Sequence, residues 1–416
     1  MGFILNLNNC AKSLLQDIQE WKNKIAAAIT AKGGQATPDS SFDELAEDIA
    51  TIPDFKLDGW TFVDDYKPTT VEDFLNNIGN VVSINDDKFT SLQRDFLFYY
   101  CESLTTVAMS NLNHIDANNT FSYAKSLGSF EAPALITING YNTFANCEAL
   151  TNVYMPELKS INGYNTFGYA KSLGSFEAPA LITINGSDAF SRCFALTTVN
   201  LPALTTINAD KAFSLCESLT TVNLPALAYI YGSRTFYYCS ALTTVYLPAL
   251  TYISGSGVFA DCSTLTTVNL PALRTIDSNT TFYYCSALTT VDLPALTVIS
   301  ESMTFSGCSA LTNVTFGTLI SLEEPFSHYK ENLRNITVGI GTNINLPFQY
   351  WNATNVIAEG QSGIDELNSN LYNNLLTKLY DHSQDGETRT LRIGWLANVS
   401  PENITYANVK GWTLTT

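Results

Sequence analysis

A phenylalanine recurs every 23 residues through the middle of this chain. Ten units carry it, at Phe98, Phe121, Phe144, Phe167, Phe190, Phe213, Phe236, Phe259, Phe282 and Phe305. In every unit a leucine follows the phenylalanine after six residues and another follows after fourteen. Strict self-similarity at such a period is typical of chains that stack one supersecondary unit on the next, since a single unit cannot bury its own apolar side chains. We therefore predict a solenoid of ten 23-residue coils.

The pattern inside one unit predicts where each coil turns. The unit from Phe213 to Thr235 reads FSLCESLTTVNLPALAYIYGSRT. Val222 and Leu224 are two residues apart, so both point to the same side of a strand, toward the core. Pro225 fixes φ and lacks an N–H, which ends the strand and starts a corner. The L-x-x-I stretch then forms a second side, and five variable residues form a loop. Parallel coils stacked at about 4.8 Å make a rod on the order of 50 Å long.

These elements resemble the BspA-like, bacterial surface type of leucine-rich repeat, whose 23-residue unit carries the same F-x-x-C, L-x-x-V/I and L-P elements. The resemblance covers Phe98 to Leu322. It implies a leucine-rich-repeat solenoid with a parallel β ladder, and adhesion or recognition rather than catalysis. Two units exchange large and small apolar side chains, which conserves core volume. They carry Ala124, Phe130 and Ala132, and Ala170, Phe176 and Ala178, in place of cysteine, valine and leucine.

The first 55 residues carry the pattern of two helices. Ser41 and Glu44 fit a capping box at the start of the second helix, which ends before Pro53. The segment from Ile29 to Ile52 resembles a short helical motif of phage tail and tail-fibre proteins. The resemblance implies an attachment or oligomerisation segment, with a homo-oligomer expected and a trimer favoured. A helical hairpin that caps the solenoid is the alternative.

The flanks of the repeat set the expected domain boundaries. We predict a helical segment over residues 1–55, an N-terminal cap over 56–97, the solenoid over 98–322 and an α+β cap over 323–416. Within the C-terminal cap the sequence predicts a helix at 364–380, a strand at TLRIGW, a helix from Pro401 and a closing strand at GWTL. Open solenoid ends need such caps, because the terminal coils have no neighbour.

Charge and hydropathy exclude two classes of partner. The formal net charge is −18, so the field of the protein repels phosphate backbones and anionic lipid surfaces. We therefore expect no nucleic-acid partner. The N-terminus lacks a cationic start followed by an apolar core, and no apolar run is long enough to span a bilayer. We expect neither a signal peptide nor a membrane partner.

The sequence shows no catalytic, metal or cofactor site, so we predict that the protein is not an enzyme. Its repeat cysteines form a ladder, at Cys101, Cys147, Cys193, Cys216, Cys239, Cys262, Cys285 and Cys308. A ladder spreads thiols along the axis instead of converging them on a metal, so we expect buried free thiols. The three histidines are scattered, and no nucleotide-binding or hydrolase motif occurs. Carboxylates that meet on one coil face and act on a glycan are the alternative.

Outward strand positions are the candidate binding surface. The tenth residue after the phenylalanine of the second to ninth units gives Glu131, Tyr154, Glu177, Asn200, Asn223, Tyr246, Asn269 and Asp292. A polar strip with two aromatic residues suits a host-surface glycan or protein. Equally, small polar side chains on a strand serve only to keep a sheet soluble.

Three functions fit these observations. The first is a phage tail-fibre or receptor-binding protein, assembled into a virion in the cytoplasm of a bacterial host, which needs no signal peptide. The second is a bacterial cell-surface adhesin, which needs export and an anchor. The third is a virion or intracellular scaffold whose repeats bind other virion structural proteins.

Overall fold

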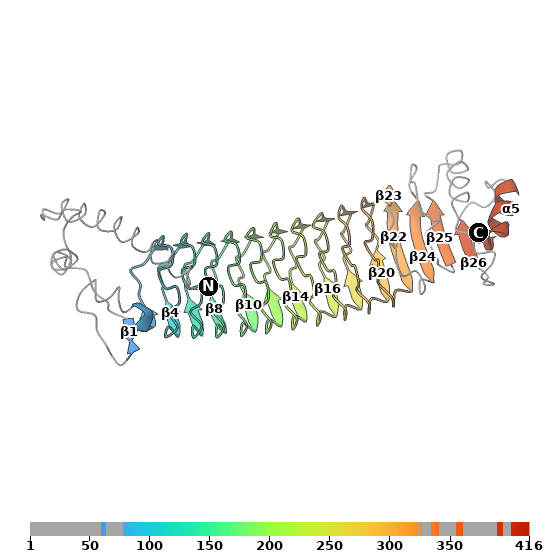
Figure 1. Cartoon of the computed structure of the whole chain (residues 1–416). Coiled ribbons are helices and arrows are strands. Elements are labelled where there is room, and N and C mark those ends of the chain that lie inside the picture. Colours follow the sequence, from blue (N-terminus) through green and yellow to red (C-terminus); the bar gives the residue numbers. More distant parts are fainter. Residues whose placement is uncertain are drawn as a thin grey trace, which may run out of the picture.

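The structure, a computed structural model, describes residues 60–63, 78–322, 325–326, 334–340, 355–360, 389–393 and 401–415. They form one elongated rod of stacked coils (Figure 1). The predicted solenoid with parallel β ladders is confirmed. The helices predicted within 1–55 and at 364–380 lie outside the described residues.

One side of the rod, here called the wide face, consists mostly of three-residue strands. Within each of its three sheets, consecutive strands of the coils pair in parallel with a register step of 23 residues, so that Val199 lies beside Val222. They run along the lower side of the rod in Figure 1. The strands are β2 (Val81–Asn85), β4 (Thr106–Ala108), β6 (Ser129–Glu131), β8 (Asn152–Tyr154), β10 (Ser175–Glu177), β12 (Thr198–Asn200), β14 (Thr221–Asn223), β16 (Thr244–Tyr246), β18 (Thr267–Asn269), β20 (Thr290–Leu293) and β22 (Asn313–Leu319).

A second side, the narrow face, is one parallel sheet of eleven two-residue strands. The second residue of each strand is apolar; in β15, for example, Ile230 is buried and Tyr229 is exposed. The strands are β3 (Ser91–Leu92), β5 (His114–Ile115), β7 (Thr137–Ile138), β9 (Ser160–Ile161), β11 (Thr183–Ile184), β13 (Thr206–Ile207), β15 (Tyr229–Ile230), β17 (Tyr252–Ile253), β19 (Thr275–Ile276), β21 (Val298–Ile299) and β23 (Ser321–Leu322). The L-x-x-I stretch therefore forms the side that the sequence predicts.

A third side contains the F-x-x-C turns. In every coil the residues two before and two after the repeat phenylalanine have positive φ, as at Lys211 (φ 55) and Leu215 (φ 60) around Phe213. Because φ is positive at Lys211 and Leu215, the N–H groups of Lys211, Phe213 and Leu215 all point along the axis of the rod. They donate to carbonyl oxygens of the next coil at 2.7–2.8 Å. The loop predicted here is thus a third hydrogen-bonded side, which satisfies the backbone without a strand.

The solenoid has one more coil than predicted. Strand β2 pairs with β4, and β3 pairs with β5, at the same 23-residue step as the other coils. Within the predicted N-terminal cap, apolar residues of other types take the consensus positions: Ile78, Val81, Ile84, Phe89 and Leu92. The prediction of ten coils was therefore wrong, because it required the full consensus, whereas Ile78 packs against the core at the cysteine position of this coil.

Stacked phenylalanine rings form the centre of the core. The rings of Phe190 and Phe213 lie 5.1 Å apart and 6° from parallel, and the other repeat phenylalanines stack in the same way. In the exchanged coils, the Phe130 ring lies 4.7 Å from that of Phe144 while Ala132 is fully buried beside it. The predicted exchange of large for small side chains thus occurs inside the core.

Both ends of the solenoid carry further elements. At the N-terminal end, β1 (Trp60–Phe62) pairs antiparallel with β2, and a short 3-10 helix, η2 (Ile78–Asn80), precedes β2. At the other end the wide face continues in parallel through β24, β25, β26 and β27, and α5 packs on β27. Their bounds are β24 (Asn335–Ile340), β25 (Asn355–Gly360), β26 (Arg389–Ile393), α5 (Pro401–Val409) and β27 (Trp412–Thr415). The strands at TLRIGW and GWTL and the helix from Pro401 are confirmed.

Candidate functional site

The eight predicted surface residues form one column along the wide face. In each strand the central valine or phenylalanine points toward the core, and the next residue points outward. The parallel register places Glu131 beside Tyr154, and Tyr246 beside Asn269. We call this set the outward column: Glu131, Tyr154, Glu177, Asn200, Asn223, Tyr246, Asn269 and Asp292.

The wide face is not one continuous sheet beneath this column. Its hydrogen-bonded ladder is interrupted between β8 and β10 and again between β14 and β16, which isolates the three strands β10, β12 and β14. The core valine is less well covered on the strand that precedes each interruption. Val153 in β8 is only half-buried and Val222 in β14 is 8% exposed, whereas Val199 in the centre of the isolated sheet is fully buried.

The two tyrosines of the outward column stand at these interruptions. Tyr154 lies on the last strand before the isolated sheet and Tyr246 on the first strand after it. Their side chains are 57% and 59% exposed, so they present large aromatic surfaces to solvent. Four coil steps separate them, about 19 Å at the parallel strand spacing. A short polar surface therefore has one exposed aromatic side chain at each of its two ends.

Polar groups between the tyrosines have defined positions. Asn223 donates a hydrogen bond from Nδ2 to Oδ1 of Asn200 at 2.7 Å, which fixes the orientation of both amides. Glu177 is exposed on the neighbouring strand of the same sheet. The surface therefore combines aromatic, amide and carboxylate groups, each able to contact a hydroxyl-bearing or peptide ligand.

The threonines that precede the strands serve the fold instead. Thr220 Oγ1 donates to the carbonyl oxygen of Thr197 at 3.2 Å, and Thr266 does the same to Thr243 at 3.1 Å. These hydroxyls bridge adjacent coils. The threonine row thus supports the interpretation that small polar residues stabilise a solvated sheet, whereas the outward column carries the groups suited to a ligand.

Sequence reasoning missed two features of the narrow face, because it assigned the asparagines and Tyr231 to variable loops and did not examine the outward residue of the L-x-x-I stretch. Four asparagines donate in series to the preceding coil and end on the carboxylate of Asp116. Further along, Tyr229, Tyr231 and Tyr252 gather on the surface. The signal was available in the sequence, since the asparagines, at Asn139, Asn162, Asn185 and Asn208, recur at the 23-residue period.

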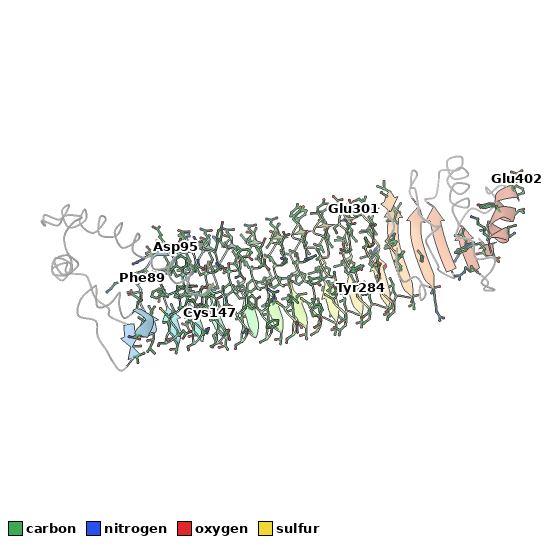
Figure 2. All side chains as sticks on the ribbon, in the orientation of Figure 1. Phe89, Asp95, Cys147, Tyr284, Glu301 and Glu402 are labelled. Atoms are coloured by element: carbon green, nitrogen blue, oxygen red, sulfur yellow. The ribbon has the colours of Figure 1, made fainter. Side chains whose placement is uncertain are left out.

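The eight repeat cysteines are buried free thiols, as predicted. Cys216 Sγ donates to the carbonyl oxygen of Phe190 at 3.2 Å, and Cys262 donates to Phe236 in the same way. Burial raises the pKa of the Cys216 and Cys262 thiols to about 12, so both are protonated and unreactive at neutral pH. All eight cysteines are part of the core packing, and Cys147 is labelled among the side chains of the rod in Figure 2.

The described ranges contain neither a cluster suited to a metal ion nor a helix suited to a membrane. No group of three or more histidine, cysteine, aspartate or glutamate side chains in these ranges is arranged to hold a metal ion. None of the helices in the part of the chain that the structure describes has the length and apolar character needed to cross a membrane.

Stacked 23-residue coils, two parallel β faces and a phenylalanine-centred core define a leucine-rich-repeat solenoid. The sequence matches the BspA type leucine-rich repeat region, a pattern of six copies, over residues 74–173, 159–280 and 232–355. The chain belongs to this family. No curated protein matches the sequence.

Several solved structures of bacterial leucine-rich repeat proteins are similar to this chain. A leucine-rich repeat protein of T. pallidum is 24% identical, with 44% of this chain and 72% of that chain covered and a TM-score of 0.32. One from Bacteroides ovatus is 21% identical, with 62% and 83% covered and a TM-score of 0.36. A leucine-rich cell surface protein from Faecalibacterium prausnitzii is 19% identical, with 69% and 85% covered and a TM-score of 0.27.

Proposed function

We propose that this protein is a non-enzymatic adhesin of the bacterial cell surface, and that its outward column binds a glycan or protein on another surface. Membership of the BspA-type family supports a binding role of bacterial surface type. A rigid solenoid suits this role, because its extended faces can present many side chains at fixed spacing. The predictions of no catalytic activity and no cofactor form part of this proposal.

One observation carries the proposal: Tyr154 and Tyr246 frame the isolated sheet of the wide face. Tyrosine is enriched in binding surfaces because it supplies a large contact area at a small cost in side-chain entropy. Exposing two such side chains on one column serves no packing purpose. A partner that spans both would also contact the amides of Asn200 and Asn223 between them.

Retention of protein-coated beads on mucin-coated and fibronectin-coated surfaces tests the proposal. The full-length protein should be retained on at least one of them, and the double variant Tyr154→Ala, Tyr246→Ala at least about tenfold less. Tyr141→Ala is the matched control, because Tyr141 is 55% exposed but lies outside the outward column. Absence of retention on both surfaces, or equal retention of the double variant, would overturn the proposal.

A phage tail-fibre or receptor-binding role in a virion stays a prediction, and so does a scaffold role that binds other virion structural proteins. The phage hypothesis depends on the resemblance of residues 29–52, which lie outside the described residues. Light scattering on the full-length chain and on a chain lacking residues 1–55 tests the expected trimer. A trimer that becomes a monomer on truncation would favour the fibre-type segment over the adhesin interpretation of these residues.

A further inference from the structure

Three tyrosines form a cluster on the narrow face, away from the outward column. Tyr229 in β15 and Tyr231 directly after it have parallel rings, with centroids 6.0 Å apart and 7° between the planes. Tyr252 in β17 is the register partner of Tyr229, and its ring lies 5.8 Å from that of Tyr231. Tyr229 and Tyr231 are 42% and 46% exposed. The three rings therefore lie next to one another at the surface, with two of them exposed and Tyr252 partly exposed.

A carboxylate held in a fixed position adjoins the cluster. Asp277 accepts a hydrogen bond from the Tyr252 hydroxyl to Oδ2 at 3.0 Å and one from Ser300 Oγ to Oδ1 at 2.6 Å. Donors on two flanking coils thus hold the carboxylate in place. Partial burial and this contact with Asp277 raise the pKa of Tyr252, so the tyrosine remains a hydrogen-bond donor. Each carboxylate oxygen has a second acceptor site, which stays available to an incoming hydroxyl.

The cluster appears where the repeat departs from its structural pattern. The position of Tyr231 is filled by hydrogen-bonded asparagines in the four preceding coils, of which Asn208 is the last. At Tyr231 this ladder ends and an exposed ring replaces the amide. The position of Tyr229 and Tyr252 is threonine in the coils on either side, at Thr206 and Thr275. Neither change serves the packing of the coils, so a contact outside the chain explains them better.

We propose that Tyr229, Tyr231, Tyr252 and Asp277 form a carbohydrate-binding subsite for a neutral glycan. The apolar C–H face of a sugar ring packs on the electron-rich faces of Tyr229 and Tyr231, and Asp277 accepts hydrogen bonds from hydroxyl groups of the same ring. The net charge of −18 disfavours sialylated or sulfated sugars. A quaternary ammonium ligand needs rings that enclose it, whereas two of these rings are parallel and open.

Glycan-array binding of the full-length protein, followed by calorimetry with the best neutral oligosaccharide, tests the subsite. Tyr231→Asn is the informative variant, because it removes the ring and restores the asparagine that the preceding coils carry, which keeps the fold intact. We expect Tyr231→Asn and Asp277→Asn each to weaken the neutral glycan about tenfold. Tyr141→Ala should leave its affinity unchanged.

The possible outcomes separate this subsite from the outward column. Neutral-glycan binding that survives Tyr154→Ala, Tyr246→Ala but is lost in Tyr231→Asn places the site on the narrow face, whatever the bead assay shows. Absence of any neutral-glycan binding, or equal binding by Tyr231→Asn, would overturn the proposal. Calorimetric binding of choline chloride in the absence of sugar binding would also overturn it and assign the cluster to cations.

Discussion

Asn162 donates a hydrogen bond from Nδ2 to Oδ1 of Asn139, at 2.7 Å, one coil earlier in the rod. Asn185 donates to Asn162 in the same way, so each amide uses its donor toward one neighbour and its acceptor toward the other. The direction of donation explains why Asp116 stands at the acceptor end, since a carboxylate can only accept. This ladder fixes the register of successive coils on the narrow face.

Replacing an inner asparagine of the ladder should destabilise the solenoid. Asn162→Ala removes the bonds to Asn139 and from Asn185, each contributing about 0.5–1.5 kcal/mol. Because the ladder is exposed, we expect a loss of about 1–2 kcal/mol in the free energy of unfolding, measured by urea denaturation. Asn208→Ala is the control, since it removes only the terminal bond to Asn185 and should cost about half as much. Equal losses in the two variants would show that the ladder contributes little.

Phe130 and Ala132 replace the consensus valine and leucine, and we expect the stability effects of reverting them to be strongly coupled in a double-mutant cycle. Phe130→Val leaves a cavity against Phe121 and Phe144, at a cost of about 2–4 kcal/mol. Ala132→Leu alone overpacks the same core and costs about 1–3 kcal/mol. The double variant restores the consensus pair, so we expect its loss to be smaller than the sum by about 1–3 kcal/mol. Additive losses, measured by urea unfolding, would contradict this account.

The apolar ladders could be predicted from sequence because they depend on residue type at a fixed period. Phe190 and Phe213 must stack once the coils are parallel, and the structure shows this stack. The first coil was missed because Ile84, which is buried, and Phe89, which packs against the core while partly exposed, occupy consensus positions with other side chains. The positive-φ positions were missed for a different reason. Residues as unlike as Lys211 and Leu215 occupy some of them, so the neighbouring coils impose the backbone conformation there, and the asparagines at the same position in other coils leave only a partial composition signal.

The candidate surfaces differ in how far sequence could predict them. A strand period of two identifies the outward column, since the residue after an inward valine must point away from the core. The interruptions of the wide face that Tyr154 and Tyr246 frame are a property of how neighbouring coils pair, and the strand pattern is the same on both sides of each interruption. The narrow-face cluster unites Tyr231 and Asp277, two positions that are 46 residues apart in sequence. Only the stacked coils bring such residues together.

Replacing one residue that has a left-handed backbone conformation should stabilise the protein. Lys211 is exposed and adopts φ 55, a conformation that costs most L-residues about 1–2 kcal/mol but is tolerated by asparagine. The equivalent residues in three other coils are Asn119, Asn142 and Asn165. We expect Lys211→Asn to raise the free energy of unfolding by about 0.5–1 kcal/mol. Lys159→Asn, at an exposed position outside this set, should give no gain; equal gains would point to surface charge instead.

The buried thiols predict a loss of stability at high pH. Burial raises the pKa of Cys216 from about 9 to about 12 in the folded state, and the thiol is uncharged when protonated. Between these values the unfolded chain releases its proton while the folded chain keeps it, so the free energy of unfolding falls as pH rises. The contribution of the protonated thiol to the free energy of unfolding is fully present below pH 9 and is lost as pH approaches 12. In this range it falls by about 1.4 kcal/mol per pH unit for each thiol.

Comparison of the parent protein with Cys216→Ala isolates this contribution. Tyrosine and lysine titrations are common to both proteins, and alanine already occupies the cysteine position at Ala124 and Ala170. We therefore expect the free energy of unfolding, measured by urea denaturation, to decrease between pH 8 and pH 10.5 by about 2 kcal/mol less in Cys216→Ala than in the parent protein. Identical losses would mean that the Cys216 thiol ionises in the folded rod, and hence that water reaches the core between adjacent coils.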